Sequence, residues 1–283
     1  MLIRRAIVAD RFYPADPQIL REEVETFFKV GPKYFSILEE KDVKPFVVML
    51  PHAGYVYCGK VLGGTLSSCI LPKRLIILCP NHTGQGKQLS VWPSGAWLSP
   101  LLPVTVDDYL AKRILDCNGG FEASTIAHLG EHSIEVLLPF LQVLLGEDNF
   151  SIVPICIGTQ NLDILKTAGQ ALGKLILDMK SGGNDIGIIV SSDMNHYESE
   201  DVTIEKDNLA LERILACDPE GLLSVMHNEH ITMCGASPMA LALITAKICG
   251  NVNASIIAHE TSATVSHDTE HVVGYAGVRL FLN

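Results

Sequence analysis

The chain has 283 residues, 48% of them hydrophobic and 19% charged, which is enough apolar material for one full core. Its formal net charge is -11 and the acidic residues are spread along the chain, so we expect neither nucleic acid nor an anionic lipid surface as a partner. No apolar segment follows the Met1 start as in an export signal, and the longest apolar runs are far shorter than a membrane span. We therefore expect a cytoplasmic protein with no membrane attachment.

Short β-branched apolar runs alternate along the chain with longer stretches of helical period, which is typical of an α/β protein. In chain order the pattern predicts a helix at 17–28, a strand at 46–50, a helix at 59–69, strands at 75–79 and 89–92, helices at 106–115 and 133–145, a strand at 151–157, a helix at 161–179, a strand at 186–191, helices at 203–216, 219–228 and 238–249, and strands at 254–259 and 274–281.

Asp16, Asp218 and Ser237 each precede a proline, and this predicts a capped helix start at each position. No repeat, linker or low-complexity tract interrupts the alternation. We expect one domain over residues 1–283, with a central, mainly parallel or mixed sheet flanked by helices.

Three of the predicted strands are each followed within a few residues by a histidine: His52, His82 and His196. The carboxyl ends of parallel strands share one edge of a sheet, where ligands usually bind, so we expect the three imidazoles to converge there. Imidazole is a common metal ligand and proton carrier near neutral pH. A single such histidine is more often satisfied by a loop carbonyl, but three parallel occurrences favour a functional site.

Cys234 differs from the other seven cysteines, which are interpreted as buried free thiols. It lies just ahead of a predicted helix, whose dipole favours the thiolate, the form that binds metal. Together with His52 and His82 it makes a three-ligand site compatible with zinc, iron or copper. His196 and Asp193 then lie across the open position as acid/base or substrate-binding groups, unless Asp193 only caps the turn.

Two alternatives remain open from these residues. His227 and His230 precede Cys234 closely enough to form a rival metal set with it, although such a cluster is more typical of a solvated helix end. A site of two histidines and one cysteine also suits zinc-dependent hydrolysis. Neither a dinucleotide fingerprint nor a serine-hydrolase nucleophile elbow occurs in the sequence.

Six short segments together resemble the Memo family, whose bacterial and archaeal branch is usually called AmmeMemoRadiSam system protein B. They span nearly the whole chain: DRFYP at 10–14, PHAGY at 51–55, PNH at 80–82, EHSIE at 131–135, SDMNHY at 192–197 and CG at 234–235. The resemblance implies the fold of the class III extradiol dioxygenases, the LigB-like non-haem iron enzymes. In those enzymes two histidines and a carboxylate hold iron, and a further histidine acts in proton transfer.

By that correspondence His52 and His82 stand at the ligand histidines, His196 at the acid/base histidine, and Cys234 in place of the carboxylate. The resemblance also places Glu131 and His132 near the pocket as support, whereas the pattern alone is equally compatible with a helix start. A thiolate donates more charge than a carboxylate and is itself oxidisable, so ring cleavage does not simply carry over.

The resemblance implies a metal-binding protein with iron or copper at the His/His/Cys site, zinc being less expected. It implies redox or oxygenase-like chemistry, as in a non-haem iron or copper dependent oxidoreductase, on an unidentified small molecule or peptide. It also associates the prokaryotic branch with AMMECR-type and radical SAM proteins as partners. The alternative, from another functional class, is a non-catalytic binding module. Such a module would use the vestigial dioxygenase pocket to bind a peptide or protein.

Overall fold

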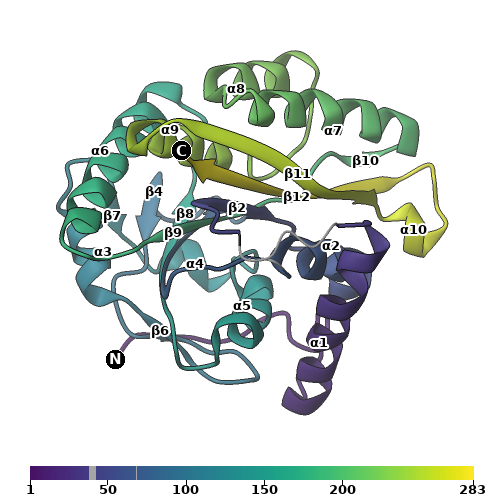
Figure 1. The fold of residues 1–283 in the computed structure, drawn as a ribbon, viewed down its shortest axis with the longest axis horizontal. Helices are drawn as coiled ribbons and strands as arrows, with labels where there is room; N and C mark the ends of the chain where they lie inside the picture. The colour runs from purple at the N-terminus through teal and green to yellow at the C-terminus, as the bar shows by residue number, and fades with distance from the viewer. Residues whose placement is uncertain (38–42, 68) are drawn as a thin grey trace.

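A mixed β-sheet with helices on both faces forms the body of the protein (Figure 1). The computed structural model describes residues 1–37, 43–67 and 69–283. The helices are α1 (Pro17–Tyr34), α2 (Tyr55–Leu66), α3 (Asp108–Leu115), α4 (Ile126–Leu129), the 3-10 helix η1 (Glu135–Leu137), α5 (Leu138–Leu145), α6 (Leu162–Ser181), α7 (Glu200–Leu215), α8 (Pro219–Asn228), α9 (Ala236–Cys249) and α10 (Ala263–Ser266). The strands are β1 (Ile3–Arg4), β2 (Val47–Leu50), β3 (Arg74–Pro80), β4 (Leu89–Val91), β5 (Ala96–Trp97), β6 (Val104–Val106), β7 (Glu122–Ala123), β8 (Ser151–Ile157), β9 (Gly187–Ser191), β10 (His196–Glu198), β11 (Val252–Thr261) and β12 (Val272–Leu282).

The sheet is parallel at its centre and antiparallel toward its sides. Strands β6, β8, β3, β9 and β2 lie side by side in that order and run in the same direction. On one side β12 pairs antiparallel with β2, β10 and β11, and on the other β5 pairs antiparallel with β6. The expected α/β fold with a mixed sheet flanked by helices is therefore confirmed. The carboxyl ends of the parallel strands share one edge, where ligands bind in such sheets.

Side chains of the central strands alternate between two apolar layers, one on each face of the sheet. In β3, Ile76 and Leu78 pack into the layer covered by α3, α6, α7, α8 and α9. Leu75, Ile77 and Cys79 pack into the layer covered by α1, α2 and α5, on the opposite side of the sheet in Figure 1. A strand covered on both faces needs no polar face, which is why β3 reads in the sequence as one apolar run.

Several predicted helix boundaries require correction. α2 begins at Tyr55 rather than at residue 59, because the extended Gly54 serves as its N-cap; Ser68, inside the predicted helix, lies outside the described residues. The helix predicted at 133–145 is split, and α5 begins only at Leu138. Pro139 lies in the first turn of α5, where a missing N–H breaks no hydrogen bond, so it opens this helix rather than interrupting a longer one.

The predicted helix caps have mixed outcomes. Asp16 and Asp218 accept hydrogen bonds from first-turn N–H groups of α1 and α8, as expected. The cap at Ser237 is wrong: α9 begins at Ala236 with Gly235 as its N-cap, so Ser237 lies inside the first turn. The unpredicted elements β1, β5, β6, β7, β10, α4 and α10 have two to four residues each, too few to show a period. No helix in the described ranges has the length and apolar character needed to cross a membrane.

Candidate metal centre

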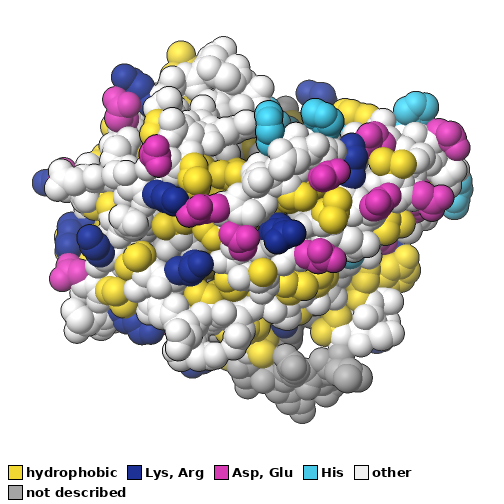
Figure 2. All heavy atoms as spheres, turned by 90° about the horizontal axis from the view of Figure 1, so that it is seen from above, with side chains coloured by type: hydrophobic (Ala, Val, Ile, Leu, Met, Phe, Trp, Pro, Cys, Tyr) yellow, Lys and Arg dark blue, Asp and Glu magenta, His cyan; other side chains and the backbone are white. Residues whose placement is uncertain are grey.

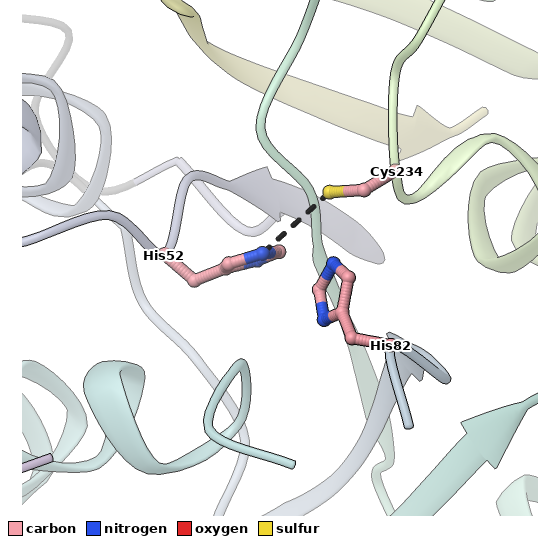
Figure 3. Close-up of side chains that lie close together, drawn as sticks. All are labelled: His52, His82 and Cys234. Carbon is pink, nitrogen blue, oxygen red and sulfur yellow. Dashed lines mark hydrogen bonds between the residues drawn. The ribbon is translucent and has the colours of Figure 1, made fainter. Parts of the chain in front are cut away.

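Three side chains from distant parts of the sequence point toward one another at the carboxyl edge of the sheet (Figure 3). His52 follows β2, His82 follows β3, and Cys234 directly precedes the N-cap of α9. A ring nitrogen of each histidine and the Cys234 Sγ lie within 4.8 Å of one another. The His52 Nε2 is 3.5 Å from that sulfur. The fold thus brings together the three residues that the sequence predicts as ligands.

The proton on the His52 ring is placed by a chain of hydrogen bonds behind it. Ser191 Oγ donates its only proton to the carbonyl oxygen of Ser133, at 2.7 Å. His52 Nδ1, 2.8 Å from Ser191 Oγ, must therefore be the donor in that contact. Burial lowers the pKa of His52 to about 4, so the ring is neutral at pH 7. The lone pair of Nε2 therefore faces the Cys234 sulfur, with which it forms a hydrogen bond, and Nε2 is the ring's available ligand atom.

Glu131 fixes His82 in the same way. His82 Nδ1 lies 2.9 Å from one carboxylate oxygen of Glu131, and the His82 backbone N–H donates to the other at 2.7 Å. Ser133 donates both its N–H and its hydroxyl to the same carboxylate. Burial opposes ionisation, yet these hydrogen bonds prevail and lower the pKa of Glu131 to about 2. An ionised carboxylate can only accept, so Nδ1 carries the proton and Nε2 is free as a ligand atom.

The segment that carries Cys234 is held directly against the end of β9. The Gly235 N–H donates to Ser192 Oγ at 3.0 Å, and the Asp193 N–H lies 3.3 Å from the Cys234 sulfur. A Cβ atom at position 235 would lie 2.3 Å from the Cβ of Ser192, closer than two such atoms can approach. Gly235 is therefore what allows the two segments to touch and Cys234 to reach the histidines.

The expectation that the α9 dipole makes Cys234 a thiolate is wrong in the absence of a bound cation. Burial, and then the charge of Asp193, raise the pKa of the thiol well above its usual range and outweigh the dipole. The pKa of His82 is raised as well: burial alone would lower it, but the hydrogen bond and charge of Glu131 prevail. A cation bound here would have to displace the thiol proton, so its affinity depends on pH.

The donor set fits a transition metal ion. Two imidazole nitrogens and one sulfur suit zinc, iron or copper, whereas magnesium and calcium prefer oxygen ligands. A tetrahedral ion with bonds of about 2.0–2.3 Å holds its ligand atoms about 3.3–3.8 Å apart, so the three atoms have only to close up from separations of at most 4.8 Å. His82, Glu131 and His132 form a second group within the same limit. Glu131 is less available there, since its oxygens already accept hydrogen bonds from His82 and Ser133.

The three residues border a hollow of about 1010 Å³ whose wall also contains His132, Asp193 and His196, whereas Glu131 is fully buried and does not line it. His196 donates from Nδ1 to the carbonyl oxygen of Thr232 at 3.1 Å, because a carbonyl only accepts, and its Nε2 is free. Asp193 Oδ1 accepts the backbone N–H of His52 at 2.8 Å, so this carboxylate positions a ligand segment as well as lining the hollow.

His132 lies beside both ligand histidines on the wall of the hollow. Its ring centroid is 5.5 Å from that of His82, nearly parallel to it, and 5.6 Å from that of His52. Burial lowers the pKa of His132, so the imidazole is neutral. Phe12 packs edge-on against it, at 4.9 Å between centroids. Glu131 and His132 thus both lie beside the candidate ligand histidines, and their support role stays a prediction.

The rival set does not form, and two other residues matter that the sequence did not single out. His227 and His230 are exposed and form no metal-binding group with Cys234 in the part of the chain that the structure describes. Ser191, held by the carbonyl oxygen of Ser133, sets the tautomer of His52. The only sequence signal for Ser191 is its position as the polar last residue of the apolar strand β9. Ser133 lies within the EHSIE segment, where only Glu131 and His132 are predicted as site residues.

The family described as Memo-like protein matches residues 4–279 of the chain. The chain belongs to the Memo family. A protein of Sulfolobus acidocaldarius named "MEMO1 family protein" is 42% identical over 288 residues, with 98% of this chain and 99% of that protein covered. One of the same name from Ignicoccus hospitalis is 40% identical over 285 residues, with 99% of both covered. The family resemblance found in six short segments is therefore confirmed.

Among solved structures, an uncharacterized protein of Escherichia coli K12 has a similar fold. The TM-score is 0.52 at 9% sequence identity, over 82% of this chain and 98% of that one. At so low an identity the likeness shows a shared fold alone, because function depends on the residues of the site and not on the fold.

Proposed function

We propose that this Memo-family protein holds iron or copper between His52, His82 and Cys234 and uses it in redox or oxygenase-like chemistry. The observation that carries the proposal is the convergence of three ligand atoms within 4.8 Å, with hydrogen bonds that leave one nitrogen of each imidazole free. Zinc suits the same donors. The resemblance to LigB-like iron enzymes is what favours a redox-active ion.

A bound iron or copper ion would supply electron transfer and an electrophilic centre beside the substrate. The chain supplies the rest. His196 Nε2, free on the wall of the hollow, would accept or return a proton of the substrate. Asp193 would keep His52 in place, and aromatic side chains of the wall would exclude water. Because Cys234 replaces a carboxylate, we do not extend the proposal to ring cleavage.

Cobalt(II) uptake tests the ligand set directly. We expect wild-type protein to bind cobalt(II) with a thiolate charge-transfer band in the near ultraviolet. The band should be absent from Cys234→Ser and retained by Cys249→Ser, a control cysteine that is also partly buried. Cobalt bound by the wild type without a sulfur band would contradict the assignment of Cys234.

The redox part of the proposal needs its own measurement. Spectroelectrochemical titration of protein loaded with iron or copper should show a reversible couple, shifted or lost in Cys234→Ser. Uptake of zinc alone, with no iron or copper retained, would contradict redox chemistry and favour zinc-dependent hydrolysis.

The size of the hollow favours a second candidate, a binding module without turnover. At about 1010 Å³ it lies at the upper end of the range for small-molecule sites, about 300–1,000 Å³, and has room for a peptide segment. Peptide capture by Cys234→Ser equal to that by wild type, with no oxygen consumption over a panel of catechols, would favour this function over the first.

For partners, we propose AMMECR-type and radical SAM proteins, on the strength of the association within the prokaryotic branch of the family. Co-elution of the purified proteins in size-exclusion chromatography, at near-physiological salt, is the expected result. Separate elution of both at concentrations of about 10 μM would contradict a stable complex.

A further inference from the structure

A second, smaller hollow reaches the candidate metal centre from the other side. Its volume is about 480 Å³, and of the described residues only His82 and Cys234 border both this hollow and the larger one. The rest of its wall comes from the segments after β3 and β8 and from the first turn of α9. The side chains of His82 and Cys234 therefore lie between the larger and the smaller hollow.

Ser237 and Pro238 of the first turn of α9 line this smaller hollow, and no side chain caps the start of the helix. Its N-cap is Gly235, which has no side chain to accept a hydrogen bond, and Pro238 has no N–H to offer. The backbone N–H groups of Ala236 and Ser237 donate to no acceptor within the described ranges. Because α9 has 14 residues, its dipole adds partial positive charge at this end.

Ser237 is an independent sign that a ligand belongs here. The residue is only 8% exposed and borders the hollow. Among the described residues its hydroxyl has no protein hydrogen-bond partner, so it can donate to a ligand in the hollow. Lys87 adds a cation at the rim, paired loosely with the exposed Glu122 at 3.1 Å.

We propose that the smaller hollow binds a small oxyanion, such as a phosphate or a carboxylate group, between the first turn of α9, the Ser237 hydroxyl and Lys87. Uncapped N–H groups and a hydroxyl at the start of a helix are the donors that oxyanions prefer. Glycines of the 84–88 segment and Gly158 line the facing wall and leave room for a ligand. The proposed oxyanion site needs no metal, since His82 and Cys234 only line its wall and donate no hydrogen bond to the anion.

Inorganic phosphate is the probe for this site, titrated into full-length, ¹⁵N-labelled protein freed of metal by chelation. We expect saturable amide shifts at Ala236 and Ser237. Ser237→Asp should weaken phosphate binding about tenfold or more, since a carboxylate would take the donors and repel the anion. Lys87→Gln should weaken it about threefold, while Lys73→Gln, which removes the same charge at the amino end of β3, should leave the affinity unchanged.

An acidic residue in the first turn favours a helix, so Ser237→Asp is expected to keep the thermal midpoint of the wild type. If it does not fold, Ser237→Ala replaces it, with an affinity expected to be about threefold lower. Saturable shifts at Ser237 that are lost in the variant support the site. The absence of saturable shifts at Ser237, or equal phosphate affinity in wild type and variant, overturns it, whatever metal the protein holds.

Discussion

At the scale of single residues, metal affinity is expected to depend on two side chains that donate nothing to the metal. Ser191 accepts the Nδ1 proton of His52, and Glu131 accepts that of His82. Replacing either partner frees the ring to rotate or to change tautomer. We expect Glu131→Gln and Ser191→Ala to lower metal affinity about 10- to 100-fold, as measured by competition with a chromophoric chelator.

Glu220→Gln is the matched control, because the exposed Glu220 pairs, within the described ranges, only with the half-buried Lys166 of α6 and with no residue of the candidate site. Its affinity should equal that of the wild type. A Glu131→Gln protein that binds metal as tightly as this control would mean that the carboxylate does not orient His82.

His128, kept out of the predicted site, gives a prediction about pH. Its ring is buried against the carbonyl oxygen of Ser90, its Nδ1 has no partner among the residues that the structure describes, and burial lowers its pKa from 6.5 to about 4. Between those values the unfolded chain binds a proton that the folded chain does not. The contribution to stability is therefore complete above pH 6.5 and lost as the pH falls toward 4, with a loss of about 2 kcal/mol by about pH 5.

Urea unfolding of the metal-free protein at several pH values measures this effect. His128→Gln should be less stable at neutral pH and should show a flatter fall in the free energy of unfolding below pH 6.5. His227→Gln, at an exposed position, should follow the wild type. Parallel pH profiles for wild type and His128→Gln would show that His128 takes up its proton in the folded state.

The convergence of the three candidate ligands could be predicted from the sequence, but their protonation could not. His52 and His82 follow apolar strands and Cys234 precedes a helix, so local pattern places all three at the sheet edge. The direction of the Ser191 hydrogen bond depends on the Ser133 carbonyl, which only the fold brings near. The thiol character of Cys234 depends in the same way on burial and on Asp193, neither of which the sequence displays.

At the scale of elements, the contact between α1 and α2 depends on glycine. A Cβ on Gly63 would lie 2.3 Å from the backbone oxygen of Phe27, so alanine cannot be placed there without moving one helix. Gly63→Ala is expected to lose about 1–3 kcal/mol of unfolding free energy, despite a gain of about 1 kcal/mol in helix propensity. The urea midpoint measures the change.

Gly182→Ala serves as the comparison, since a Cβ there meets nothing closer than 3.4 Å. It should change the midpoint little. If Gly63→Ala instead stabilises the protein, the two helices do not lie as closely together as described.

Element prediction from sequence succeeds where packing and local pattern agree. The strand at 151–157 and the helix at 219–228 have the predicted bounds, the first as a continuous apolar run and the second with its Asp218 cap. Ser237 fails as a cap because the tertiary contact of Gly235 with Ser192 starts α9 earlier. Two-residue strands such as β5 exist through their partners and carry no signal of their own.

At the scale of the whole molecule, the charge distribution bears on the prediction that the partners are not polyanions, which stays a prediction. The net charge is -11, and acidic and basic side chains are interspersed on the face over α7 and α8 that Figure 2 shows. A face of mixed sign has no extended basic stripe of the kind that nucleic acid binds.

Metal binding should also raise the stability of the whole fold, because the three ligands come together only in the native state. A metal at about 1,000 times its dissociation constant adds about 4 kcal/mol to the free energy of unfolding. We expect the thermal midpoint to rise when ferrous iron is added anaerobically to wild type and to Cys249→Ser, but not to Cys234→Ser. An equal rise in all three would place the metal elsewhere.

The central claim is that His52, His82 and Cys234 hold a redox-active metal, and the most direct test is elemental analysis of protein purified without oxygen, alongside His82→Ala. We expect near-stoichiometric iron or copper in the wild type and its loss in the variant. Wild-type protein that contains no metal and takes up none when iron or copper is added would contradict the claim.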